Sequence, residues 1–133
     1  MVTKKSVLVV DDSTENQELL KIIFQKYSID VHCTSNGEEA LSLLNKISIL
    51  PDLIILDLQM PIMNGYLFRK EQLKNKKFTD IPVIVMSADD VPDLNEKMEF
   101  PQGVLIKPVQ FDSLIKTVIS VAPLLRPRFK TFQ

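Results

Sequence analysis

This sequence of 133 residues has little cysteine, almost no excess of charge of one sign and few long apolar runs. Cys33 is the only cysteine, so the chain cannot close an internal disulfide, which is compatible with a reducing compartment. The 16 basic and 17 acidic side chains nearly cancel, and they offer no broad positive field for a nucleic acid backbone. Lys4 and Lys5 precede only a short apolar run, residues 7–10, well short of a signal-peptide core or a membrane span. We therefore expect a cytoplasmic protein without direct nucleic acid binding or membrane insertion.

The length and composition are those of one packed domain. Of the 133 residues, 45% are hydrophobic, which is typical of a globular core rather than of disorder. No internal repeat, low-complexity stretch or linker precedes Ala122. We interpret residues 123–133 as a frayed terminus or the start of a linker, so that the domain is predicted to cover residues 1–122.

Five short apolar segments are typical of β-strands. Residues 7–10, 53–56 and 83–86 are continuously apolar and largely β-branched, as is common for parallel strands that are covered on both faces. Residues 30–34 alternate polar with apolar side chains, which predicts a second strand at an edge of the sheet. Residues 104–106 are a further short candidate.

Helical patterns separate these strands. Apolar side chains repeat at three- and four-residue intervals in residues 20–27 and 40–47, and most clearly in residues 111–122. Residues 66–73 fit a third helix, while residues 93–100 are bounded by prolines and can hold only a short fourth helix. This alternation predicts an α/β fold, a doubly wound five-stranded parallel sheet with helices on both faces.

Polar side chains follow the predicted strands at their carboxyl ends, where ligand sites of such sheets lie. They are Asp11 and Asp12, Asp57, Ser87, and Lys107, after the first, third, fourth and fifth strands in that order. Three carboxylates brought together repel one another and need a cation or an unusual protonation state. Mg²⁺ fits best, because it accepts one or two carboxylates, keeps several waters and commonly shares its shell with a phosphate. Lys107 can pair with Asp57 or a phosphoryl oxygen, and Ser87 offers a hydroxyl donor.

Each of these residues also has an ordinary structural explanation. Asp12 and Glu15 have the spacing of a helix capping box, Ser87 could cap a helix, Asp57 could begin a turn, and Lys107 could be a solvated strand end. The functional interpretation depends on their common position, since independent capping residues should fall at both ends of the sheet.

Residues 56–65, LDLQMPIMNG, resemble the phosphorylation-site segment of the receiver domains of two-component response regulators. In that family an Asp is followed by Met-Pro and then by Gly. Residues 9–12, 86–88 and 106–108 stand in the same order as in the family, so the resemblance covers residues 6–122. It implies the flavodoxin-like strand order 2-1-3-4-5 and a phosphorelay function, in which an aspartate accepts a phosphoryl group from a phosphohistidine.

The resemblance also implies a magnesium site. Asp57 would be the phosphoacceptor, and Asp12, Asp57 and the backbone carbonyl of Gln59 would bind Mg²⁺ directly. Asp11 would act through a metal-bound water.

Beside the metal, the resemblance implies that Ser87 and Lys107 contact the phosphoryl group. Lys107 would be followed by a cis proline, Pro108, and Ala88 would leave room for the incoming phosphate.

The residue that commonly acts as a conformational switch in this family differs in this chain. Many receivers have Tyr or Phe three residues before the lysine, where this chain has the stiff, branched Val104. We therefore expect phosphorylation to act through Ser87 and the following loop, which begins with Ala88 and Asp89. That loop would shift the short fourth helix, with Phe100 as the moving apolar group.

The resemblance implies two kinds of partner. A histidine kinase or a histidine phosphotransfer protein would be the donor, and a downstream protein or attached output domain would bind the fourth helix, fifth strand and fifth helix. The domain would catalyse its own phosphorylation and dephosphorylation, and it would not be an enzyme that turns over a separate substrate.

Three alternatives have different signatures. An aspartyl phosphohydrolase typically has a second Asp two residues after the nucleophile, where this chain has Gln59. A flavodoxin-like nucleotide-binding module would use Ser13 and Thr14 in a phosphate loop, but Asp11 and Asp12 would repel the phosphate. A degenerate receiver that only binds a partner would lack a site residue, and none is missing.

Overall fold

One parallel sheet forms the centre of the computed structural model, which describes residues 4–88, 91 and 93–129. Its five strands have the order β2-β1-β3-β4-β5. They are β1 (Lys5–Val10), β2 (Ile29–Thr34), β3 (Leu53–Asp57), β4 (Val83–Ser87) and β5 (Gly103–Ile106). All four pairings between neighbouring strands are parallel, so the predicted fold and strand order are confirmed.

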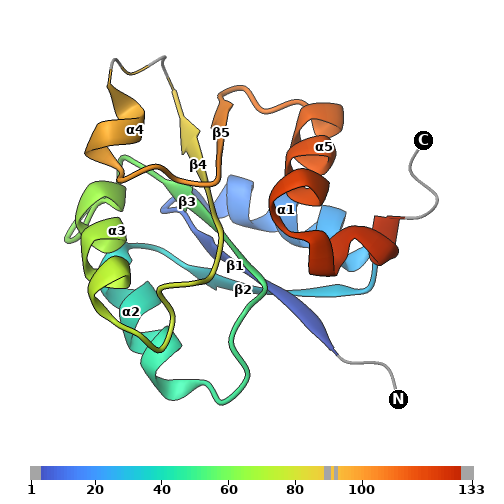
Figure 1. The fold of residues 1–133 in the computed structure, drawn as a ribbon. Coiled ribbons are helices and arrows are strands. Elements are labelled where there is room, and N and C mark those ends of the chain that lie inside the picture. Colours follow the sequence, from blue (N-terminus) through green and yellow to red (C-terminus); the bar gives the residue numbers. More distant parts are fainter. Residues whose placement is uncertain (1–3, 89–90, 92, 130–133) are drawn as a thin grey trace.

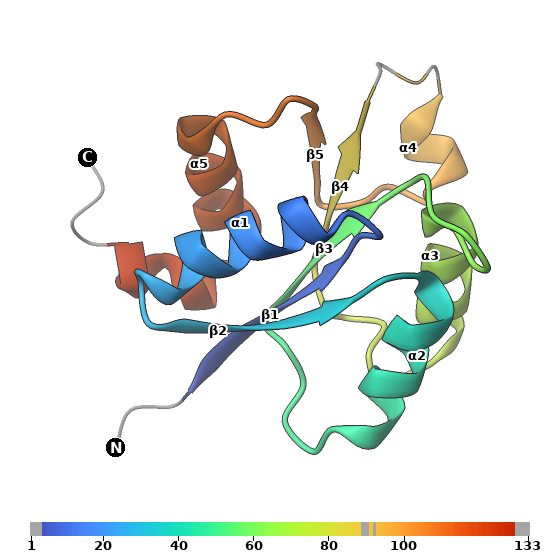
Figure 2. The ribbon, with the colours of Figure 1, turned by 180° about the vertical axis from the view of Figure 1, so that it is seen from behind.

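Helices cover both faces of this sheet (Figures 1 and 2). They are α1 (Thr14–Gln25), α2 (Gly37–Lys46), α3 (Gly65–Lys74), α4 (Leu94–Lys97) and α5 (Phe111–Val121), followed by the 3₁₀ helix η1 (Pro123–Phe129). α1, α5 and η1 lie on one face, and α2, α3 and α4 lie on the other. In the part of the chain that is described, no helix is both long enough and apolar enough to span a membrane.

The alternation of side chains along the strands builds two cores. In β3, Leu53 and Ile55 pack with α1 and α5, whereas Ile54 and Leu56 pack with α2, α3 and α4. All four side chains are completely buried. This explains the continuous apolar run in β3, because neither face of a central strand meets water.

Side-chain caps begin the three helices that follow β1, β2 and β3. The hydroxyl of Ser13 accepts a hydrogen bond from the Asn16 backbone N–H at 3.3 Å and caps α1. Asn36 and Asn64 cap α2 and α3 in the same way. The cap of α1 is therefore Ser13, and Asp12 does not have the capping role considered for it.

The segment after Ala122 corrects our expectation of a frayed tail. Residues 123–129 form η1, and its side chains Leu125 and Phe129 are 0% and 2% exposed within the core on the α1 and α5 face. The Phe129 ring packs on Tyr27 with centroids 4.6 Å apart. The sequence shows no helical pattern here, because Arg126 and prolines interrupt the apolar residues. The packed domain therefore continues to Phe129.

This packing predicts the effect of a single truncation. Phe129→Ala should lower the free energy of unfolding by about 3 kcal/mol, because it removes a buried aromatic side chain and leaves a cavity. Leu124→Ala in the same helix is the matched control, since Leu124 is 65% exposed, and it should change stability by less than about 0.5 kcal/mol. Urea unfolding followed by circular dichroism measures both. Equal unfolding midpoints for the two variants would show that η1 does not stabilise the domain.

Candidate functional site

The predicted polar residues meet at the carboxyl ends of the strands. Asp57 and Ser87 are the last residues of β3 and β4, and Asp11 and Lys107 directly follow β1 and β5. Asp11, Asp57 and Ser87 are buried, with exposures of 0%, 4% and 3%. The Lys107 backbone N–H donates to the Ser87 carbonyl at 2.7 Å, which holds the ends of β4 and β5 together.

Three carboxylates converge at this edge. Asp11, Asp12 and Asp57 each offer an oxygen, and these oxygens lie within 4.8 Å of one another. Asp12 is exposed, whereas Asp11 and Asp57 are buried. The three aspartates are typical of a hard divalent cation site, because all the donors are carboxylate oxygens and one carboxylate is open to water. The residues therefore fit Mg²⁺.

Asp11 is held by the first turn of α1. Its Oδ1 accepts from the Ser13 backbone N–H at 2.8 Å, and its Oδ2 accepts from the Asn16 side-chain amide at 3.1 Å. Gln17 donates its side-chain amide to the Asp11 backbone carbonyl at 2.7 Å and to the Thr34 carbonyl at 3.3 Å. Our sequence analysis missed Asn16 and Gln17. Their polar side chains on the first turn after the two aspartates were the available signal.

The negative charge of Asp57 is only partly offset by its neighbours. Its pKa is raised above the ordinary carboxyl value, first by burial and then by repulsion from Asp11. The Lys107 ammonium, 3.2 Å from Oδ1, lowers this pKa by attraction and by a hydrogen bond, and the Gln59 backbone N–H lowers it further by donating a hydrogen bond. Burial and repulsion exceed these stabilising contacts, so the site favours additional positive charge.

The turn after Asp57 explains the Asn-Gly pair. The Asn64 side chain caps α3, and the Gly65 N–H donates to the Leu58 carbonyl at 3.1 Å. A Cβ on Gly65 would lie 2.5 Å from the Asp57 carbonyl oxygen, so no larger residue fits without moving the backbone of the phosphoacceptor candidate. Gln59 is exposed in this turn, and its carbonyl stays a predicted metal ligand.

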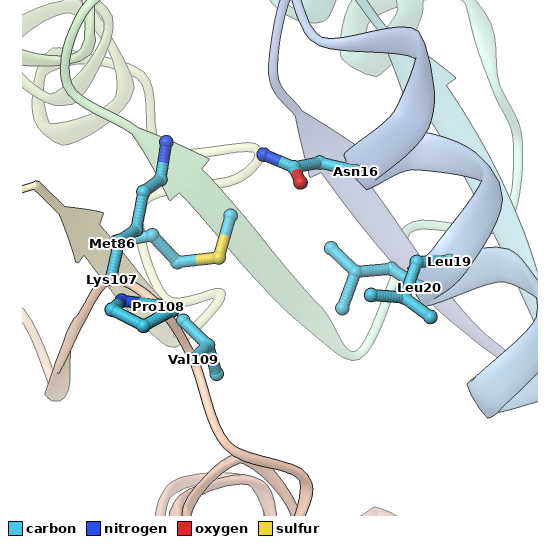
Figure 3. Close-up of a pocket in the computed structure, with 7 residues that line it drawn as sticks. All are labelled: Asn16, Leu19, Leu20, Met86, Lys107, Pro108 and Val109. Carbon is cyan, nitrogen blue, oxygen red and sulfur yellow. The ribbon is translucent and has the colours of Figure 1, made fainter.

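Lys107 also borders a small cavity of about 220 Å³ between α1 and the segment after β5. Figure 3 shows the Lys107 ammonium and the Asn16 amide at the same end of this cavity, above apolar side chains. These apolar side chains are Leu19, Leu20, Met86, Pro108 and Val109. The peptide bond between Lys107 and Pro108 is cis, as the resemblance implied.

The predicted switch and tuning residues are divided between this site, where Ala88 follows Ser87 and Pro108 follows Lys107, and positions away from it. Ala88 is exposed just after β4, and Val104 is 36% exposed on β5. Phe100 is 67% exposed and precedes β5, so it lies toward the opposite end of the sheet from Asp57. Asp89 lies outside the described residues.

Comparison with known proteins gives one consistent result. The profile of the family described as the response regulator receiver domain matches residues 7–119. Protein PilH of Pseudomonas aeruginosa is 28% identical over 117 residues, which are 86% of this chain and 95% of PilH. The sensor histidine kinase CheAY of Helicobacter pylori is 33% identical over 82 residues, which are 62% of this chain but 10% of CheAY. The solved structure of chemotaxis protein CheY4 of Vibrio cholerae matches with a TM-score of 0.81 and 27% identity over 90% of this chain and 99% of CheY4. The chain thus spans nearly all of one relative and about a tenth of another.

The electrostatics of Asp57 predict a pH-dependent stability. A raised folded-state pKa means that the contribution of Asp57 to stability is present below the ordinary carboxyl range and is lost as the pH rises through the folded-state pKa. Asp57→Asn should therefore raise the free energy of unfolding of the metal-free protein at pH 7, and the gain should shrink as the pH falls toward about 4. Urea unfolding in a chelator at both pH values measures this. Asp80→Asn, at an exposed carboxylate, is the control. A gain that is equal at both pH values would contradict the electrostatic cause.

Proposed function

This chain belongs to the response regulator receiver domain family, and we propose on that basis that Asp57 accepts a phosphoryl group from a phosphohistidine. The observation that carries the proposal is the pairing of the buried Asp57 carboxylate with Lys107 at 3.2 Å, next to the carboxylates of Asp11 and Asp12. The family acts in two-component signalling, and the domain is a signalling unit rather than an enzyme for a separate substrate.

The proposed transfer is a displacement at phosphorus. A carboxylate oxygen of Asp57 forms a bond to phosphorus while the bond from phosphorus to the imidazole nitrogen of the donor breaks, and that nitrogen keeps the electron pair. Lys107 lies beside the nucleophile and neutralises negative charge on the phosphoryl oxygens. The Ser87 hydroxyl, at the end of the neighbouring strand, is the proposed hydrogen-bond donor to the same group, and Ala88 leaves space for it.

Asp12, Asp57 and the carbonyl of Gln59 are the proposed direct ligands of Mg²⁺, and Asp11 is the proposed ligand of a metal-bound water. When bound, Mg²⁺ supplies positive charge that offsets the carboxylates and the phosphoryl oxygens. The contacts of Asp11 support this division, because both of its oxygens already accept hydrogen bonds from Ser13 and Asn16. Asp12 is exposed and has its carboxylate available.

The proposed donor is a histidine kinase or a histidine phosphotransfer protein, and the proposed place of transfer is the cytoplasm, where the exposed Cys33 would stay reduced. The proposed output surface is the face of α4, β5 and α5. Its exposed apolar side chains Val104, Ile106 and Phe111 support this assignment, because partner surfaces are commonly apolar at their centre. Loss of the phosphoryl group by hydrolysis at the same site completes the proposed cycle.

The alternative of nucleotide or flavin binding is not favoured. The loop after β1 would have to bind the phosphate, and it carries Asp11 and Asp12 within reach of a third carboxylate. Such a cluster repels a free phosphate in the absence of a cation.

A small phosphodonor tests the proposed acceptor. Acetyl phosphate with Mg²⁺ should add one phosphoryl group to the protein, and Asp57→Asn should remove at least about 90% of this modification, because Asp57 is the carboxylate of the described cluster that pairs with Lys107. Mass spectrometry of the intact protein measures the product. Asp80→Asn should react like the native protein. Undiminished modification of Asp57→Asn would refute the assignment.

The metal ligands are tested by a pair of adjacent substitutions. Asp12→Ala should weaken Mg²⁺ binding by about tenfold or more, whereas Asp11→Ala should weaken it less, since an outer ligand contributes through a water. Titration calorimetry at constant ionic strength gives both dissociation constants, and circular dichroism confirms that both variants are folded. Equal dissociation constants would contradict the division between direct and water-mediated ligands.

A further inference from the structure

A buried cation lies on the side of α3 that faces α4. Arg69 of α3 is 3% exposed and Gln72, one turn later, is 0% exposed. Burial lowers the pKa of the Arg69 guanidinium, although the charge of Glu99 opposes this effect. A buried guanidinium is costly unless its N–H groups are satisfied, so its hydrogen-bond partners indicate what it does.

Arg69 donates to three consecutive backbone carbonyls at the end of α4. Nε donates to Met98 at 2.9 Å, and Nη2 donates to Glu99 at 3.1 Å and to Phe100 at 3.3 Å. Glu99 and Phe100 both have left-handed backbone conformations, with φ of 51° and 53°. Helices commonly end with glycine in this conformation, because other side chains are strained there. Here hydrogen bonds from a charged donor stabilise two non-glycine residues in it.

Gln72 connects the same cation to a second loop. Its Oε1 accepts from Arg69 Nη1 at 2.9 Å, and its Nε2 donates to the carbonyls of Phe78 at 3.2 Å and Ile81 at 3.0 Å. Arg69 and Gln72, which we call the α3 clasp, therefore hold the α4–β5 loop and the α3–β4 loop to α3. Both loops lead into the amino ends of strands, away from Asp57.

Among the described residues, the other end of α4 has no side-chain hydrogen bond comparable to those of Arg69, although Leu94 is buried in the core. α4 has four residues, and its N-cap, Asp93, makes no side-chain hydrogen bond to the helix. The Leu94 backbone N–H makes a weak hydrogen bond of 3.3 Å to the Val91 carbonyl. This end follows the segment that begins at Ser87, so it is the end of α4 that is connected to the phosphorylation site. Figure 1 shows α4 beside α3 on one face of the sheet.

We propose that the α3 clasp makes the C-terminal end of α4 and the α4–β5 loop a fixed anchor, about which phosphorylation moves the N-terminal end of α4. This inference rests on the proposed phosphorylation of Asp57. In this proposal Phe100 is not the moving group that we expected from the sequence. Its carbonyl accepts a hydrogen bond from Arg69, and its N–H donates to the Asn95 carbonyl at 2.6 Å.

The anchor has a consequence for the partner. The backbone of Phe100 then has the same position in both states, and a contact that does not differ between two states cannot shift their equilibrium. Phe100 can add affinity for a partner, but discrimination between phosphorylated and unphosphorylated protein must come from contacts nearer Leu94. Arg69 is thus a positioning residue for output.

The first experiment uses the native protein. Amide NMR spectra are recorded with Mg²⁺ before and after addition of beryllofluoride, which mimics the phosphoryl group. We expect shifts at Ser87, Ala88 and Leu94, and none at Glu99 and Phe100. Shifts at Phe100 as large as those at Leu94 would overturn the anchor. An absence of shifts at every residue would refute phosphoryl acceptance itself and, with it, the movement about the anchor.

The second experiment tests the clasp without a phosphoryl mimic. Arg69→Met keeps an apolar stem and removes the donors, so hydrogen exchange of the Phe100 amide should become at least about tenfold faster, because hydrogen bonds to a charged group are lost. Lys70→Met, at the exposed neighbouring residue, should leave the exchange rate unchanged. With beryllofluoride, Arg69→Met should now show shifts at Phe100. Unchanged exchange at Phe100 in Arg69→Met would overturn the role of the clasp.

A third variant covers the case in which Arg69→Met does not fold. Arg69→Lys keeps the charge but cannot reach three carbonyls with one ammonium group, so exchange at Phe100 should lie between the native and fully released rates. Exchange identical to that of the native protein would show that the fork of hydrogen bonds does not hold the loop.

Discussion

The functional site depends on one negative charge that its neighbours offset only in part, that of Asp57 at the end of β3. Asp57 is 4% exposed, and the sheet places a second buried carboxylate, that of Asp11, beside it. Lys107 approaches to 3.2 Å, yet burial and repulsion still raise the pKa of Asp57. A protein that holds two carboxylates in this way loses stability unless further positive charge arrives. The site therefore favours a cation, and the hydrogen bonds from Ser13 and Asn16 hold the Asp11 carboxylate in place.

The two ends of the sheet differ in the contacts that hold them together. At the carboxyl end, charges of both signs are close together and their balance changes when a cation or a phosphoryl group is added. At the amino end, Arg69 and Gln72 satisfy the backbone of two loops with buried hydrogen bonds. α4 has only four residues, so in the proposed switch it would move as a short element rather than bend as a long one. In the proposed output through α4, the effect of phosphorylation would depend on which end of this helix is fixed.

Much of the fold was predictable because the strands of a parallel sheet have a distinctive pattern. The runs at residues 53–56 and 83–86 are apolar on both faces, and the structure places them at the centre of the sheet. The convergence of Asp11, Asp57 and Lys107 followed from their positions after strands, since parallel strands end at one edge. The packing of Phe129 was not predictable, because η1 has too few residues for a periodic pattern and contains a proline.

The sequence by itself determined the order of strands and helices, the edge at which the polar residues gather, and the segment of residues 56–65 that carries the proposed acceptor. These properties depend on periodicity and on local backbone preferences, which neighbouring residues express. The tertiary structure alone decided the packing of Phe129 on Tyr27 and the burial of Arg69 against the end of α4. Each depends on a contact whose partner or geometry is set only when the chain is packed, and for Arg69 the partners are the backbone carbonyls of residues 98–100, which carry no signal in their side chains.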